Sequence, residues 1–268
     1  MENLRNYLIE SLTNWYDGHI HIFNHIEPIE RPSGFAKVVG FMDLEYGADE
    51  IDVIGAYDNF IQNDLTDDII LLATGVTFDD INAVYSKYKA HIRGFGELKC
   101  YDEYKGEKVP YKQISLVKDV CELSAKNGNL PVYVHWDLND QDDVDKIEQV
   151  LANYPNIPIV LCHSGMNKSN MDFAYKNAVL LQNQHNNLWI DISYSALDHL
   201  YDNIDKIFQY DPTRIIVGTD LNNKLWGANH DTLTEVTSIM TKYKNLIYTA
   251  KIDNALNIDK LFGISKGA

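Results

Sequence analysis

The sequence predicts an α/β protein whose 268 residues (1–268) form a single domain, a TIM-type (β/α)8 barrel. Short apolar runs alternate along the chain with longer stretches of helical period, which is the pattern of repeated strand and helix units. Eight such runs occur, and eight is the strand number of a closed parallel barrel. Several runs end in a histidine or an acidic residue, where barrels of this type gather functional side chains.

Each predicted strand is a short apolar run, often ending at a polar or turn-forming residue. The strands are predicted at residues 17–23, 36–42, 69–74, 91–98, 131–135, 158–163, 188–192 and 214–219.

Most segments between these strands carry apolar residues three and four positions apart, the spacing of one helix face. In residues 115–127, Leu116, Val120 and Leu123 form such a stripe, and Gly128 ends it. Helices are predicted at residues 80–90, 115–127, 142–153, 171–181, 197–208 and 232–243.

The connection after the first strand, residues 24–35, breaks this pattern. It is short, and Pro28 and Pro32 interrupt it. A full crossover helix does not fit there, so we expect a loop that lies over the site.

Composition limits the partners of the chain. Asp and Glu number 39 against 23 Lys and Arg, which gives a net charge of −16. Such a charge disfavours binding to a nucleic-acid backbone or an anionic membrane surface, and no apolar run approaches membrane-spanning length. We therefore expect a small-molecule substrate, no nucleic acid and no membrane.

Cysteine usage and the amino terminus bear on the compartment. Cys100, Cys121 and Cys162 are odd in number and unpatterned, which fits a reducing compartment better than a disulfide framework. The first residues contain no apolar core of signal-peptide type. The expected location is the cytoplasm.

Residues 16–22 form a short apolar run that carries two histidines, His19 and His21, one residue apart. In a strand both point to the same side, together with Asp17. Two imidazoles on one face can chelate a divalent metal ion, although most such pairs are ordinary surface or core histidines. Metal binding therefore requires ligands from other parts of the chain.

Four further strand positions carry suitable groups. His135 ends the fifth predicted strand, His163 the sixth and Asp220 the eighth, while Glu97 lies near the end of the fourth. Taken singly, a histidine can donate to a backbone carbonyl and Asp220 can cap the next helix. Together with the first pair, these groups occupy six positions within or at the ends of predicted strands. One metal site explains this arrangement better than six separate structural roles do.

Imidazole and carboxylate are ligands for zinc, and also for manganese or iron. The set suffices for a divalent metal site of one or two ions, with zinc as the leading candidate. Zinc can lower the pKa of bound water to about 7, and a neighbouring carboxylate can accept the proton. Hydrolysis is the chemistry that this arrangement favours.

Other residues near the strand ends have two interpretations. Cys162 precedes His163 in the same strand and is expected to face the opposite side, in ordinary packing. Ser193 and Tyr194 follow the seventh strand, and Trp226 follows the eighth; they either line a pocket or pack as loop residues. The sequence assigns no substrate-binding residue.

These motifs resemble the amidohydrolase superfamily, and within it the amidohydrolase-2 branch related to aminocarboxymuconate semialdehyde decarboxylase. The resemblance runs nearly from end to end. It rests on Asp-Gly-His-Ile-His at 17–21, Gly-Phe-Gly-Glu-Leu at 94–98, Val-His at 134–135, Leu-Cys-His-Ser-Gly at 161–165, Gly-Thr-Asp at 218–220 and the Asn-Ala helix that begins at 254.

The resemblance implies a distorted barrel in which His19, His21 and His135 bind metal. It implies that His163 is a catalytic acid or base close to the metal, or a ligand of a second ion, and that Asp220 binds metal or handles the water proton. Glu97 stands where some relatives carry a bridging carbamylated lysine and others a glutamate. A homodimer is an expectation that comes from the resemblance alone.

Two departures limit the transfer of a substrate. Residues 221–226 differ from relatives that have an aromatic residue and a proline directly after the aspartate. The decarboxylases hold a substrate carboxylate with an arginine from an early loop, and Arg31 is the nearest match here.

Three functions follow from these observations. The first is a metal-dependent hydrolase of an amide, lactone or ester, with Asp220 and His163 as catalytic groups. The second is a metal-dependent, non-oxidative decarboxylase, a lyase, of a small carboxylic acid. The third is a barrel that binds a ligand without turnover, which the completeness of the ligand set disfavours.

Overall fold

A computed structural model describes residues 15–22, 35–42, 52–63, 67, 69–100, 103–104, 107–108, 114–167, 169–222 and 230–264. Nine strands form its main sheet, in the order β10-β9-β8-β7-β4-β3-β2-β1-β11. Their bounds are β1 Trp15–Ile22, β2 Phe35–Met42, β3 Ile69–Ala73, β4 Ile92–Lys99, β7 Val132–His135, β8 Ile159–Leu161, β9 Leu188–Ile192, β10 Ile215–Val217 and β11 Leu221–Asn222. A separate hairpin joins β5 Glu103–Tyr104 to β6 Glu107–Lys108.

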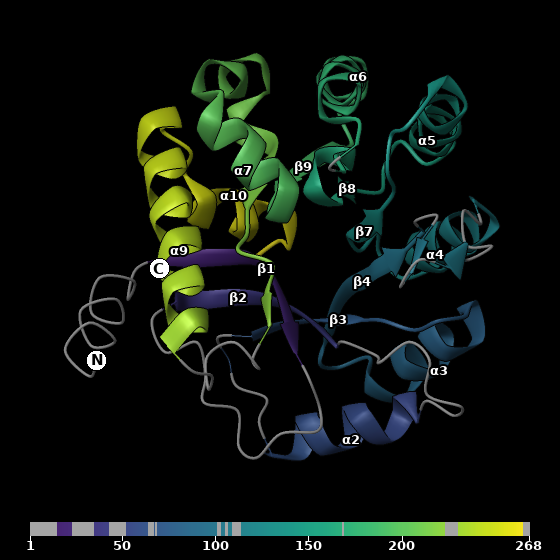
Figure 1. Cartoon of the computed structure of the whole chain (residues 1–268). Helices are drawn as coiled ribbons and strands as arrows, with labels where there is room; N and C mark the ends of the chain where they lie inside the picture. The colour runs from purple at the N-terminus through teal and green to yellow at the C-terminus, as the bar shows by residue number, and fades with distance from the viewer. Residues whose placement is uncertain are drawn as a thin grey trace.

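Helices surround the strands in a ring, as Figure 1 shows. The α-helices are α2 Val53–Asn63, α3 Phe78–Tyr88, α4 Ile114–Lys126, α5 Gln141–Asn153, α6 Met171–Gln184, α7 Tyr194–Asp202, α9 His230–Ala250 and α10 Asn254–Leu261. Three 3-10 turns add η1 Cys162–Gly165, η2 Ile204–Gln209 and η3 Pro212–Arg214.

All pairs in the main sheet are parallel, and one short segment joins its two edges. β10 pairs with β9, and β11, a few residues later, pairs with β1. Between them Gly218 N donates to Ile192 O, and Asp220 N donates to His19 O. The predicted TIM-type (β/α)8 barrel is confirmed, as eight parallel strands in a nearly closed barrel with helices between them.

A buried carboxylate reinforces this closure. Asp17 on β1 accepts hydrogen bonds from Thr219 N at 2.9 Å and from Thr219 Oγ1 at 2.6 Å. Its side chain is fully buried, so the two bonds satisfy acceptors that water cannot reach. The sequence placed Asp17 on the histidine side of its strand, and the structure uses it to hold the first and last strands together.

Five of the six expected helices are present as α3, α4, α5, α6 and α9, whereas the helix expected at 197–208 divides at Asn203 into α7 and the 3-10 turn η2. The local sequence explains where α3 begins. Thr77 caps α3, because its hydroxyl accepts from Asp80 N while the Asp80 carboxylate accepts from Thr77 N. Such a capping box contributes about 1 kcal/mol. The buried face of α3 carries Ile81, Val84 and Tyr85, as the spacing predicts.

Helix α2 is not among the predicted helices, although the chain carries a signal for it. Val53, Ala56, Tyr57 and Phe60 are buried at helical spacing, and Asp52 Oδ1 accepts from Gly55 N at its start. Of the expected loop at 24–35, residues 24–34 lie outside the described part of the chain.

Two apolar layers form the core. One lies between the strands and the outer helices. The other fills the barrel, where Phe41 and Tyr133 meet edge to face with ring centroids 5.1 Å apart. Helix α10 adds Ile258 and Leu261 to this inner layer, and its Asn257 binds the Ile215 carbonyl at the start of β10. The predicted closing helix therefore plugs the amino end of the barrel and leaves the carboxyl end for the site.

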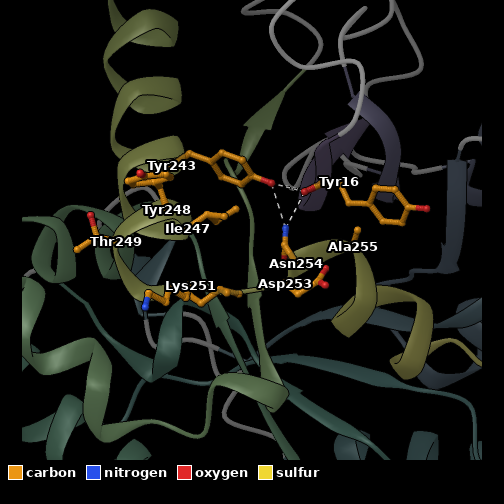
Figure 2. Close-up of a pocket in the computed structure, with 10 residues that line it drawn as sticks. Tyr16, Tyr243, Ile247, Tyr248, Thr249, Lys251, Asp253, Asn254 and Ala255 are labelled. Carbon is orange, nitrogen blue, oxygen red and sulfur yellow. Dashed lines mark hydrogen bonds between the residues drawn. The ribbon is translucent and has the colours of Figure 1, made fainter.

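A pocket lies beside this plug, between α9 and α10 (Figure 2). Tyr16, Tyr243 and Asn254 meet in it: Tyr243 Oη and Asn254 Nδ2 both donate to the Tyr16 carbonyl. These polar groups satisfy one another, and the pocket is at the opposite end of β1 from the histidines. Within the described part of the chain, no helix combines the length and apolarity that crossing a membrane requires.

The cysteines are expected to be unreactive in the folded protein. Burial raises the pKa of Cys100 and of Cys121 to about 12, and that of Cys162 well above its usual range. Because the thiolate is the reactive form, a thiol reagent such as DTNB should label less than about 0.2 thiols per native chain within minutes, and all three cysteines after denaturation. Rapid labelling of a native thiol would contradict the described packing.

Candidate metal centre

The structure brings the six predicted site residues together at the carboxyl end of the barrel. They come from five different places: β1, β4, the end of β7, the turn after β8 and the segment that follows β10. The residues are His19, His21, Glu97, His135, His163 and Asp220. Five strands that are far apart in the sequence thus supply one cluster, as the strand-end pattern predicts.

One half of the cluster joins β1 to the end of β10. Asp220 Oδ1 lies 2.9 Å from His21 Nε2 and 3.3 Å from His19 Nε2. The two Nε2 atoms are 3.3 Å apart. Both histidines of the first strand therefore point the same nitrogen at one carboxylate oxygen.

Glu97 forms the centre of the second half of the cluster, and it also approaches the histidines of the first half. Its Oε1 lies 2.8 Å from His135 Nδ1 and 3.4 Å from His163 Nε2. It also lies close to the first half, with Oε2 3.6 Å from His21 Nε2 and Oε1 3.9 Å from His19 Nε2. Glu97 is 1% exposed, so water does not screen these contacts.

Unusual backbone conformations aim these side chains. In the described residues, six non-glycine positions have positive φ, and four of them follow strands β8 to β10: His163 at 51°, Ser164 at 56°, Tyr194 at 46° and Asp220 at 57°. The left-handed region costs a non-glycine residue about 1 kcal/mol or more. Such residues cluster where a functional geometry is held by the surrounding fold.

The carboxylates and imidazoles alter one another's ionisation. Burial raises the pKa of a carboxyl, but His135 and His163 bring the pKa of Glu97 well below its usual range. Burial also raises the pKa of Asp220, but the neighbouring His19, His21 and His163 outweigh burial and lower it. Both groups are therefore carboxylates at neutral pH.

The carboxylates of the cluster in turn raise the pKa values of its buried histidines. Burial lowers the pKa of a histidine, yet Asp191, Asp220 and Glu97 raise the pKa of His19 to about 10. The pKa of His163 is raised as well, chiefly by its hydrogen bond to Glu97, which outweighs burial. The centre of the cluster therefore favours positive charge.

A divalent cation fits this set of donors. Three overlapping groups have ligand atoms within 4.8 Å of one another: His19 with His163 and Asp220, His19 with His21 and Glu97, and Glu97 with His135 and His163. Imidazole nitrogen and carboxylate oxygen are the ligands of zinc sites that keep a position open for substrate or water. The overlap of the groups is compatible with one ion or two.

Two residues of the site were not assigned by the sequence reasoning. Asp191 on β9 accepts from His19 Nδ1 at 2.7 Å, and Ser193 contacts His163 Nδ1 at 2.8 Å. Both are fully buried. The available signal was a lone carboxylate inside the apolar run Leu188–Ile192, because a buried charge requires a partner.

Cys162 departs from the sequence expectation that it faces away from the site. It belongs to the apolar cluster inside the barrel, and its Sγ lies within 4.8 Å of ligand atoms of His19 and Asp191. The physical reason is local: β8 ends at Leu161, and the next residues form a 3-10 turn with left-handed backbone at His163. Strand alternation therefore does not extend to Cys162 and His163.

Tyr194 lies at the exposed side of the cluster. Its side chain is 53% exposed, and its ring meets that of His163 edge to face with centroids 5.8 Å apart. Arg31 and Trp226 lie outside the described residues, as do the side chains of residues 221–226.

Comparison with known proteins bears on the fold. No protein-family model and no curated protein matches the sequence. Among solved structures, an amidohydrolase from Burkholderia multivorans with bound zinc superposes with a TM-score of 0.59 at 13% identity, covering 94% of this chain and 99% of the other. This chain shares the (β/α)8 barrel fold of that protein.

Two further structures agree. A proposed 2-pyrone-4,6-dicarboxylic acid hydrolase from Pseudomonas putida has a TM-score of 0.57 at 15% identity, over 94% of this chain and 98% of that one. A TatD family hydrolase from Entamoeba histolytica has a TM-score of 0.56 at 11% identity, over 92% and 99%. At these identities the likeness concerns the barrel and leaves the substrate open.

Proposed function

We propose that the protein is a metal-dependent hydrolase that activates water for attack on an amide, lactone or ester of a small molecule. The observation that carries the proposal is the position of Asp220, whose Oδ1 lies 2.9 and 3.3 Å from the Nε2 atoms of His21 and His19. A carboxylate beside two imidazoles supplies metal ligands and a proton acceptor in one place. Solved hydrolases with the same fold, one with bound zinc, support the proposal.

The residues that would hold the metal are His19, His21, Glu97, His135, His163 and Asp220. Zinc is the leading candidate because the set consists of imidazoles and carboxylates, with manganese or iron as alternatives. When bound, such an ion polarises a carbonyl and makes water acidic at neutral pH.

Two residues carry the proton transfers in this proposal. Asp220 is a carboxylate at neutral pH and accepts the proton of the attacking water. His163 Nε2 faces Glu97 at 3.4 Å and lies beside the exposed Tyr194 ring. Its pKa is raised by the Glu97 hydrogen bond, and when both of its ring nitrogens are protonated it donates the Nε2 proton to the leaving group. His163 is also a member of two ligand groups, so it serves the metal or the proton transfer according to the number of ions bound.

The decarboxylase alternative lacks an observed partner for a substrate carboxylate. In the described residues the two arginines lie away from the site: Arg93 is exposed near the start of β4, and Arg214 bonds Asp211 and the Gln182 carbonyl at the amino side of β10. Hydrolysis of a neutral carbonyl therefore fits the described residues better.

A screen of lactones, esters, amides and aromatic carboxylates tests the proposal. The protein loaded with zinc or manganese is expected to hydrolyse at least one neutral carbonyl substrate, and prior dialysis against dipicolinate is expected to lower the rate about 100-fold or more, with recovery on adding the ion back. Release of carbon dioxide from a carboxylate without hydrolysis would instead establish the lyase. Hydrolysis that is unaffected by the chelator would contradict a metal-dependent mechanism.

A further inference from the structure

A single carboxylate oxygen lies behind two of the four histidines of the cluster, His19 and His163. Asp191 Oδ2 is 2.7 Å from His19 Nδ1, 2.7 Å from Ser193 Oγ and 3.3 Å from the backbone N of His163. The Asp191 side chain is fully buried, and its other oxygen has no hydrogen-bond partner in the described part of the chain. All of its described polar contacts therefore concern the two histidines and the serine between them.

The protons in this group can be counted. An ionised carboxylate only accepts, so His19 Nδ1 must carry a hydrogen and donate it to Asp191. A serine hydroxyl has one hydrogen, and Ser193 donates it to Asp191 Oδ2. Toward His163 Nδ1, 2.8 Å away, Ser193 can then only accept. His163 Nδ1 therefore also carries a hydrogen.

These hydrogen positions give His19 and His163 the same tautomer. With Nδ1 protonated, each neutral imidazole has its lone pair on Nε2. The Nε2 atom of His19 faces Asp220 at 3.3 Å, and that of His163 faces Glu97 at 3.4 Å. Both lone pairs thus point into the proposed metal centre.

The position of Ser193 shows that its hydroxyl is committed to this role. Ser193 is the N-cap residue of α7, where a serine side chain ordinarily accepts from a backbone amide of the first helical turn. Its side chain makes no such capping bond. The hydroxyl instead joins Asp191 to His163.

We infer that Asp191 and Ser193 are positioning residues that set the tautomer and orientation of His19 and His163 together, through one carboxylate oxygen. The inference rests on the proposed metal site. Asp191 acts directly on His19, and Ser193 relays the same carboxylate to His163. Partners of this kind behind a metal-binding histidine are worth about 10- to 100-fold in metal affinity.

The test compares Ser193→Ala with Ser195→Ala, using Zn²⁺ as the probe. Ser195 is a buried serine near the start of the same helix, but its hydroxyl donates to the Met166 carbonyl and contacts no described histidine. The dissociation constant for zinc, measured by competition with a chelating dye, is expected to rise about 10- to 100-fold in Ser193→Ala and to change less than about 3-fold in Ser195→Ala.

A second readout does not depend on affinity. In the zinc-loaded protein labelled with ¹⁵N-histidine, the Nδ1 hydrogens of His19 and His163 are expected to be protected from exchange. Ser193→Ala should expose that of His163 and retain that of His19, whereas Asp191→Ala should expose both.

The outcomes separate the two proposals. If the parent chain binds zinc and Ser193→Ala matches Ser195→Ala in affinity and in its protected Nδ1 hydrogens, the positioning role is wrong while the metal site stands. If the parent chain binds no zinc, the metal site and the inference built on it both fail.

Discussion

Substitution of Asp220 by asparagine is expected to lower hydrolysis by about 10²- to 10⁴-fold, the usual worth of a general base. Asparagine keeps the size of the side chain but cannot accept a proton. The Asp220 carboxyl is ionised at neutral pH, as a proton acceptor must be, because three histidines lower its pKa despite burial. The measurement is the initial rate on the best substrate of the screen, with metal content determined on the same sample.

A neighbouring carboxylate provides the control. Asp137 Oδ1 lies 3.8 Å from His135 Nε2, at the edge of the cluster. Asp137→Asn removes a charge of the same sign close by, and is expected to change the rate less than about 10-fold. Equal losses in the two variants would mean that the negative charge of the site matters and that proton transfer by Asp220 does not.

Substitution of Gly218 by alanine is expected to damage the fold and the site together. A Cβ at this position would lie 2.4 Å from His19 Cβ and 2.7 Å from His19 N, so part of the neighbouring strand would have to move. Overpacking of this kind costs about 3 kcal/mol, which lowers the Tm by about 6 to 12 °C in a chain of this size. Zinc affinity should also fall, because one of the two segments forced apart carries His19 and the other carries Asp220.

Gly128→Ala separates the two effects. Gly128 has φ of 93°, a conformation that alanine adopts at a cost of about 1 kcal/mol, and a Cβ there meets no atom within 4 Å. This variant should lower the Tm by about 2 to 4 °C and leave zinc affinity unchanged. If Gly218→Ala likewise retained full zinc affinity, the close approach of β10 to β1 would not be what positions the ligands.

The barrel could be predicted because its signals are local. Apolar runs and helical stripes are properties of short segments, and eight strands in alternation with helices leave few topologies. The meeting of the candidate residues could be predicted for a related reason: parallel strands bring their carboxyl ends to one face, so His135, His163 and Asp220 needed only to end strands in order to meet.

What the sequence could not give depends on tertiary geometry. Strand alternation placed Cys162 and His163 on opposite sides, but the chain turns after Leu161 and both face the interior. The pairing of Asp191 with His19 links residues 172 positions apart, and Ser193 looks like an ordinary helix cap until its hydroxyl is seen to bond elsewhere.

The central claim is that the strand-end cluster binds a divalent metal, and metal content tests it most directly. Elemental analysis of the purified chain is expected to find about one or two equivalents of zinc, manganese or iron, and the double variant His19→Gln/His21→Gln should retain less than about 0.1. A content near two that falls to one in Glu97→Gln would indicate two ions bridged by Glu97, and a content near one that is unchanged would indicate a single ion. A parent chain without bound transition metal, or a double variant with undiminished content, would contradict the claim.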